Sequence, residues 1–236
     1  MFSRQHCCGC GTWSKFWAVA LVFVAGFAPA TLPHAALPSL ERAFQLAQAR
    51  YGAPAVLALN QWRDMVVQVQ NLPEREKMTR VNDFFNRRVQ FREDVDIWGK
   101  ADYWATPLET MGRGEGDCED FAIAKYVTLK TLGVPVEKLR MTYVRAQIGG
   151  SSSSVTQAHM ILSYYPSAAE EPLILDNLID DIRPASRRAD LYPIFSFNSA
   201  GLWVGSGATE KASGSSTARL SRWRDLLARM QTEGFE

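Results

Sequence analysis

Cysteine is scarce in this chain, and three of its four cysteines, Cys7, Cys8 and Cys10, lie within the first ten residues. Cys118 is the one cysteine further along. A single cysteine cannot form a disulfide within the chain, so a disulfide-stabilised scaffold is excluded for the residues after the N-terminal segment. A lone thiol in the body of the chain therefore has either an ordinary structural role or a chemical one.

Long hydrophobic runs are also missing. The longest apolar run covers residues 16–27, with Arg4 and Lys15 before it and small residues at 28–30 and 35–36 after it. This layout is typical of a secretory signal peptide, and the run is shorter than the roughly 20 residues that span a bilayer. We expect residues 1–36 to be a signal peptide cleaved between positions 30 and 36. An uncleaved membrane anchor is the alternative.

The chain has no excess of charge of either sign. Its 26 basic and 25 acidic residues give a net charge of +1, and removal of Arg4 and Lys15 with the signal peptide would leave 24 basic residues. This balance predicts no basic surface for nucleic acid or membrane lipid. Hydrophobic residues make up 47% of the chain, which suffices for one sizeable core in a domain of roughly 200 residues.

The periodicity of hydrophobic residues predicts helices in the first half of the chain and strands in the second. Segments 39–53, 56–72, 74–89 and 117–132 have helical spacing, and segment 94–116 is an aromatic stretch that we expect to be irregular. Segments 139–147, 158–165, 173–178 and 194–204 have strand character, and 218–230 predicts a terminal helix. The sequence thus predicts an α+β fold with an antiparallel sheet, a single domain over 37–204, and a flexible segment plus helix over 205–236.

Cys118 lies at the predicted start of a helix, in the sequence Gly116-Asp117-Cys118-Glu119-Asp120. A cysteine nucleophile reacts as the thiolate, and the positive end of a helix dipole and its free N–H groups favour a thiolate and a developing oxyanion. Uncompensated carboxylates at Asp117, Glu119 and Asp120 would instead raise the thiol pKa. These acids therefore suggest a Ca²⁺ site, with Asp117 and Asp120 near one helix face and Glu119 projecting elsewhere. An ordinary acidic helix start is the alternative.

His159 is the single histidine beyond the N-terminal region. If 158–165 and 173–178 form a hairpin whose turn centres between Ser167 and Ala168, His159 and Asp176 lie opposite each other on one face. A carboxylate in that position fixes the histidine tautomer, which completes a Cys-His-Asp triad. The side-chain donors of Tyr103 and Trp104 are candidates for oxyanion stabilisation; simple packing against the helix is the alternative.

These motifs together resemble the bacterial transglutaminase-like cysteine proteinases. The resemblance rests on Gly116-Asp117-Cys118-Glu119-Asp120-Phe121-Ala122, on Ala158-His159-Met160, on Leu175-Asp176-Asn177 and on the upstream residues Trp98, Tyr103-Trp104 and Thr106-Pro107. It covers roughly residues 54–204.

The resemblance implies a papain-like/transglutaminase-like core, in which a helix that carries the cysteine packs on an antiparallel sheet that carries the histidine and aspartate. It also implies a periplasmic, calcium-dependent cysteine endopeptidase that cleaves the N-terminal region of a large surface adhesin at a paired-alanine site and so controls biofilm attachment. The implied partner is an inner-membrane cyclic-di-GMP receptor of the LapD type.

Two other functions remain compatible with the residues. A transglutaminase or another acyltransferase would use the same triad and differ in whether an amine or water resolves the thioester. A catalytically inactive exported binding module is the second alternative. Trp203 is a candidate anchor for a protein partner, although it could equally close the core.

Overall fold

The computed structural model describes residues 40–150, 152–204 and 217–235. The described residues belong to one compact unit, Ala35–Glu236. The expected signal peptide and residues 205–216 lie outside the described part. None of the helices within the described ranges combines the length and hydrophobicity needed to cross a membrane.

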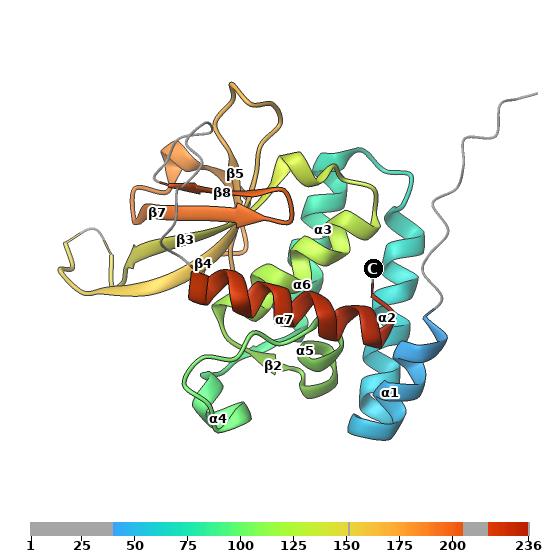
Figure 1. The fold of residues 1–236 in the computed structure, drawn as a ribbon. Coiled ribbons are helices and arrows are strands. Elements are labelled where there is room, and N and C mark those ends of the chain that lie inside the picture. Colours follow the sequence, from blue (N-terminus) through green and yellow to red (C-terminus); the bar gives the residue numbers. More distant parts are fainter. Residues whose placement is uncertain (1–39, 151, 205–216, 236) are drawn as a thin grey trace, which may run out of the picture. The chain divides into compact units, whose positions relative to one another are not determined.

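Helices dominate the first half of this unit, and a sheet forms most of the second half (Figure 1). The helices are α1 (Glu41–Tyr51), α2 (Ala53–Val69), α3 (Glu74–Arg88), α4 (Asp94–Trp98), α5 (Pro107–Arg113), α6 (Cys118–Thr131) and α7 (Thr217–Glu233), with the 3₁₀ turns η1 (Val136–Lys138) and η2 (Ala185–Arg187). The strands are β1 (Gln90–Phe91), β2 (Glu115–Gly116), β3 (Leu139–Gln147), β4 (Thr156–Tyr164), β5 (Leu173–Leu175), β6 (Arg183–Pro184), β7 (Leu191–Asn198) and β8 (Gly201–Val204).

The main sheet has the strand order β6-β5-β4-β3-β7-β8, and each neighbouring pair in it is antiparallel. A second, two-stranded sheet pairs β1 with β2 in parallel. The α+β class with an antiparallel sheet is therefore confirmed. The longest pairing joins β3 and β4, whose residues match from Leu139↔Tyr164 to Gln147↔Thr156.

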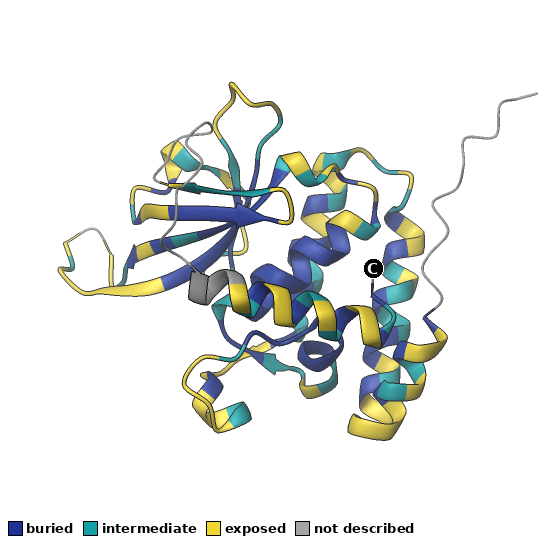
Figure 2. Cartoon of the chain, viewed as in Figure 1, coloured by how far each residue is buried: buried dark blue, intermediate teal, exposed yellow. Residues whose placement is uncertain are grey.

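Helix α6 is buried on almost all sides (Figure 2). Every residue from Asp120 to Leu129 is buried, and the helix contacts α3 and α5 as well as β3 and β4. A helix that is largely apolar around its circumference must lie inside the core. The Trp62 indole of α2 donates to Thr128 Oγ1 of α6 at 2.8 Å. This buried bond adds a polar connection between α2 and the C-terminal part of α6.

The expectation that 94–116 is irregular is wrong in part, because the segment contains α4 and α5. Helix α5 begins with a capping box, in which Thr106 Oγ1 accepts from the Glu109 N–H and Glu109 Oε2 accepts from the Thr106 N–H. Pro107 adds a favourable first residue, and Gly114 ends the helix with φ 69°. These local signals are strong enough to form a helix of two turns without a long hydrophobic repeat.

The predicted hairpin register is also wrong, by two residues. The observed pairs Leu162↔Leu175, Ser163↔Ile174 and Tyr164↔Leu173 place the turn centre between Ala168 and Ala169. Strand β5 is shorter than expected and ends at Leu175. Since side chains alternate with period two, a shift of two residues keeps each side chain on its predicted face. His159 and Asp176 are therefore diagonal neighbours rather than directly opposite each other.

The C-terminal helix α7 belongs to the same core as the helices and the sheet. Trp223, Leu226 and Met230 are buried in the main hydrophobic cluster. The Trp223 ring packs edge-on against Tyr126 of α6 and Phe197 of β7, with ring centroids 5.5 Å apart in both pairs. Helix α7 thus contributes to the support of the helix that begins at Cys118.

Candidate active site

Cys118 is the first residue of α6, with Asp117 as the N-cap residue. Cys118 is a partly buried residue, and its thiol donates a hydrogen bond to Glu119, with Sγ and Oε2 3.1 Å apart. Burial, the charges of Glu119 and Asp117 and this hydrogen bond raise the pKa of Cys118 well above its ordinary value, while the backbone N–H of Met160 lowers it. The contact with Met160 places Sγ beside strand β4.

His159 precedes Met160 on the same strand. Strand β5 pairs with β4 only from Leu162 to Tyr164. The part of β4 that carries His159 therefore extends past the end of β5. Met160 and Leu162 belong to the main core, whereas Ile161 belongs to a smaller apolar cluster. By strand alternation His159 shares the face of Ile161. The thiol contacts β4 at Met160, and His159 is the next residue along the same strand.

His159 and Asp176 are in contact, as the sequence predicts. His159 Nε2 and Asp176 Oδ1 are 2.7 Å apart, and both side chains are almost completely buried. Burial alone would raise the pKa of Asp176, but the hydrogen bond from His159 and the charges of His159 and Arg188 hold it at about 2. Asp176 is therefore a carboxylate, and its bond to Nε2 leaves Nδ1 as the ring nitrogen that can face a thiol. Within the described residues no hydrogen bond joins Cys118 to His159.

Asp117 and Asp120 form a buried acidic cluster with Asp94 of α4, which sequence reasoning missed. One carboxylate oxygen from each lies within 4.8 Å of the others. Asp94 is 2% exposed, Asp117 8% and Asp120 0%. Among the described residues, Asp94 Oδ1, Asp117 Oδ1 and Asp120 Oδ2 are buried without a hydrogen-bond partner. Buried, unpaired carboxylate oxygens are costly unless a cation or proton compensates them.

The pKa values of these acids show how strongly they interact. Burial and the charges of Glu119, Asp120 and Asp94 raise the pKa of Asp117 to about 10. Burial raises the pKa of Asp94 to about 6, against the opposing effect of a hydrogen bond from the Tyr103 N–H. Burial also raises the pKa of Asp120 well above its usual range. Burial and neighbouring acids together thus raise the pKa of all three carboxyl groups.

The backbone around the cluster is shaped to hold Asp120 in place. Asp120 Oδ1 accepts from the Ala105 N–H at 2.7 Å, and Asp94 Oδ2 accepts from the Tyr103 N–H. A Cβ at Gly116 would lie 2.8 Å from Asp120 Cβ and 2.9 Å from Asp120 Oδ2, so glycine is required there. One oxygen of Asp94 and one of Asp120 are thus oriented by backbone donors, and the other oxygen of each is buried without a hydrogen-bond partner among the described residues.

Glu119 does not join the group of three buried aspartates, but it lies close to Asp117 and Asp94, so the expectation that it projects elsewhere is wrong in part. It belongs to two further acidic groups, one with Asp117 and Cys118 and one with Asp94 and Asp102. Hard carboxylate oxygens at this separation fit Ca²⁺, whose ligand oxygens lie at about 2.3–2.6 Å from the ion. The arrangement can therefore hold Ca²⁺ between Asp94, Asp117 and Asp120, with Glu119 at the side of the thiol.

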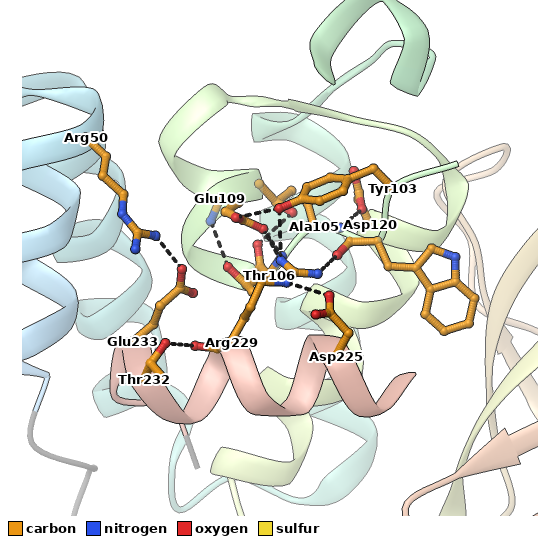
Figure 3. A network of polar contacts seen from close by, with 12 residues as sticks. Arg50, Tyr103, Ala105, Thr106, Glu109, Asp120, Asp225, Arg229, Thr232 and Glu233 are labelled. Atoms are coloured by element: carbon orange, nitrogen blue, oxygen red, sulfur yellow. Dashed lines mark hydrogen bonds and ion pairs between the residues drawn. The ribbon is translucent and has the colours of Figure 1, made fainter. Parts of the chain in front are cut away.

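Tyr103 and Trp104, the two candidate oxyanion donors, lie in a polar network with α7 (Figure 3). The Tyr103 hydroxyl donates to Glu109 Oε1 at 2.8 Å and accepts from Arg229 Nη1 at 3.1 Å. Arg229 Nη2 also donates to the Trp104 carbonyl at 2.6 Å. Trp104 is buried, and its ring stacks on Phe197 with centroids 5.6 Å apart. The Tyr103 hydroxyl thus serves to hold the segment that supplies the Ala105 N–H.

Trp203, the candidate partner anchor, is half-buried on β8. The Arg140 guanidinium lies 4.0 Å from its ring centroid. The ring therefore has an intramolecular contact of the cation–π type, which accounts for its position without a protein partner.

The family model and the solved structures that match this chain agree with each other. A family model described as bacterial transglutaminase-like cysteine proteinase matches residues 59–205. The structure is similar to Legionella pneumophila LapG, with 39% identity, a TM-score of 0.67, and coverage of 82% of this chain and 98% of that chain. The EGTA-treated form of Legionella pneumophila LapG has 38% identity, a TM-score of 0.68 and the same coverage.

The calcium-bound form of the same protein has 39% identity and a TM-score of 0.66, and the match covers 81% of this chain and 99% of that chain. No curated protein sequence matches the chain.

Proposed function

Because this chain belongs to the bacterial transglutaminase-like cysteine proteinases and is a cysteine protease by that membership, we propose that Cys118, His159 and Asp176 are its catalytic triad. The observation that carries the proposal is the buried His159–Asp176 pair, 2.7 Å between Nε2 and Oδ1, beside a helix that begins at Cys118. Nucleophile, base and orienting carboxylate are the three roles that peptide hydrolysis by a thiol requires.

The reaction follows from these positions. His159 Nδ1 takes the thiol proton, and the Cys118 thiolate attacks the carbonyl carbon of the scissile peptide bond. The N–H groups in the first turn of α6 lack intrahelical partners and point toward the developing oxyanion. His159 then protonates the leaving amine as the C–N bond breaks, which leaves a thioester. A water molecule deprotonated by His159 hydrolyses the thioester and regenerates the thiol.

We also propose that Asp94, Asp117 and Asp120 bind Ca²⁺, with Glu119 as the fourth and more peripheral acid. Support comes from the three buried oxygens without hydrogen-bond partners among the described residues and from the similarity to calcium-bound Legionella pneumophila LapG. Bound Ca²⁺ would supply the positive charge that offsets the carboxylates and so lowers the free-energy cost of the Cys118 thiolate.

The proposed substrate is the N-terminal region of a large cell-surface adhesin, cleaved in the periplasm after export of the protease. An inner-membrane cyclic-di-GMP receptor of the LapD type is the proposed regulatory partner, and biofilm attachment the process controlled. Support comes from the 39% identity to Legionella pneumophila LapG over 82% of the chain and from the signal-like residues 1–36.

The test is incubation of the mature protein with an adhesin N-terminal fragment that contains a paired-alanine site, followed by mass spectrometry. A hydrolase gives two fragments with a free carboxylate at the cut, whereas an acyltransferase gives an amide adduct when excess primary amine is added. The Cys118→Ala protein is the control and should give no product. Cleavage that persists in Cys118→Ala, or amine adducts in place of free carboxylates, would contradict the proposed protease.

A further inference from the structure

The two oxygens of the Asp176 carboxylate have different partners. Oδ1 accepts from His159 Nε2 at 2.7 Å and from the Leu178 N–H at 3.1 Å. Oδ2 accepts from Arg188 Nη2 at 2.7 Å. The side chains of Asp176 and Arg188 are 0% and 3% exposed. The carboxylate is therefore held on the side opposite His159 by a buried guanidinium, which the triad itself does not require.

Arg188 is in turn held by an acid on its outer side. Its Nε is 3.0 Å from Asp190 Oδ1, and its Nη2 is 2.8 Å from Asp190 Oδ2. The Arg188 N–H donates to the Ala185 carbonyl at 2.9 Å, which fixes the backbone between η2 and β7. Since a guanidinium is a planar fork that bonds carboxylates in fixed directions, anchoring by Asp190 also sets the direction in which Arg188 meets Asp176.

Apolar surroundings strengthen the ion pair between Arg188 and Asp176. The sheet face that carries His159 is covered by an apolar cluster that includes Val144, Ile161, Ile174 and Leu191. A small cavity of about 90 Å³ on this face has Arg188 among its lining residues, together with Ile161 and Ile174. Charged groups in such apolar surroundings interact more strongly than they do in water. Water is therefore a poor replacement for Arg188 at Asp176 Oδ2.

We propose that Arg188 is a positioning residue of the protease reaction, which holds Asp176 in the orientation that presents Oδ1 to His159 Nε2. The inference rests on the proposed function, because it assigns Arg188 a part in that reaction. Rotation of the carboxylate about its Cβ–Cγ bond would turn Oδ1 away from the imidazole, and the bond to Oδ2 opposes that rotation. With Nε2 held by Asp176, the ring keeps Nδ1 as the nitrogen free to act on the thiol.

A purely structural ion pair would stabilise the fold without affecting the imidazole. The two roles differ in measurable ways, since misplacement of a catalytic group lowers kcat while substrate binding is retained. The His159 Nε2–H resonance in NMR spectra reports the bond to Asp176 directly. It can be recorded without substrate, with its assignment checked by its loss in His159→Gln.

The test compares Arg188→Met, Arg188→Lys and Arg187→Met with the wild-type protein. Arg187 is the adjacent, exposed arginine and serves as the matched control. Arg188→Met should lower kcat on the order of 100-fold with little change in KM, and the Nε2–H resonance should broaden or disappear. Arg188→Lys keeps the charge but not the fork, so it should give a smaller loss of kcat and a shifted resonance. Arg187→Met should behave as wild type.

A folded Arg188→Met protein with wild-type kcat and an unchanged Nε2–H resonance would overturn the inference. If Arg188→Met does not fold, Arg188→Lys decides: a reduced kcat and shifted resonance support positioning, and wild-type values overturn it. If the wild-type protein cleaves no peptide but its Nε2–H resonance still depends on Arg188, the proposed function fails while the positioning of His159 by Arg188 stands.

Discussion

The side chains that most constrain this active site are the buried aspartates Asp94, Asp117 and Asp120. Each has a buried oxygen without a hydrogen-bond partner among the described residues, directly beside the first residue of α6. If all three were ionised, their mutual repulsion would destabilise the native state unless a cation or bound protons offset it. The charges of Glu119 and Asp117 also oppose formation of the thiolate at Cys118. Stability of the helix start and reactivity of the thiol therefore depend on the same electrostatic balance.

Replacement of Asp94 tests its part in the calcium site. Asp94→Asn removes one buried carboxylate, so calcium affinity measured by titration calorimetry should fall at least about tenfold. Asp96, exposed on the same short helix, is the matched control, and Asp96→Asn should bind as wild type. Equal affinities in Asp94→Asn and wild type would exclude Asp94 as a ligand.

Asp176 should change how the free energy of unfolding falls at acid pH. Its pKa is lowered from 3.8 to about 2, so its contribution to the free energy of unfolding is fully present above about pH 4 and is lost as the pH falls toward 2. Between pH 4 and pH 2 the wild-type protein should lose about 2 kcal/mol more than Asp176→Asn. Urea unfolding at several pH values measures this, and parallel curves for the two proteins would contradict it.

Sequence reasoning found the site residues that stand out by residue type or by strand register, Asp176 among them, and missed Asp94 and Arg188, which only the fold brings near. Cys118, His159 and the acids Asp117 and Asp120 stand out by type and position. Asp94 accepts a hydrogen bond from the Tyr103 N–H, which holds it in the acidic cluster. Arg188, in the loop before β7, donates to Asp176. Neither contact follows a helical or strand period, so the sequence pattern carries no signal for it. The acidic residues 93, 94 and 96 beside the aromatic stretch are the nearest available hint for Asp94.

Helices and strands with long periodic patterns were predictable, and short elements were not. The start and end of α3 and β3 agree with the pattern within one residue, because a hydrophobic repeat of several turns or pleats specifies them. Helices α4 and α5 depend on caps and tertiary bonds instead. The β4–β5 register was off by two because the loop 166–171 contains no residue pair that fixes the turn centre.

Helix α7 and the segment before α5 act together in supporting the site. Arg229 of α7 bonds Glu109 Oε2 and the Trp104 carbonyl, each at 2.6 Å. The same segment donates the Ala105 N–H to Asp120 at 2.7 Å. A continuous series of contacts thus connects the C-terminal helix to the acidic cluster (Figure 3).

Loss of the Arg229 contacts should destabilise the protein and slow turnover. Arg229→Met leaves Glu109 without its cation in a largely buried position, which should lower the free energy of unfolding by about 2–3 kcal/mol. Turnover should fall as well, because the Tyr103–Ala105 backbone loses its support. Arg224, exposed on the same helix, provides the control. An Arg229→Met protein as stable and active as Arg224→Met would show that α7 has no such part.

The fold as a whole places a thiol that needs positive surroundings next to several acids, and these two features conflict when no cation is bound. A nucleophilic thiolate needs positive surroundings, yet the chain places four acids, Asp94, Asp117, Glu119 and Asp120, close to Cys118. Backbone N–H donors hold Asp94 and Asp120 in this buried cluster. Ca²⁺ bound as we propose would offset these charges and make the reactivity of Cys118 depend on the ion.

The most direct measurement is the initial rate of adhesin-fragment cleavage as a function of free Ca²⁺ in EGTA-buffered solution, with iodoacetamide alkylation of Cys118 followed in parallel. Cleavage and alkylation rates should rise together and reach half-maximum at the same free Ca²⁺. Mg²⁺ should substitute poorly, because it is smaller and sheds water reluctantly. Undiminished cleavage in excess EGTA, with no Ca²⁺ binding detected by calorimetry, would contradict a calcium-dependent Cys118 nucleophile.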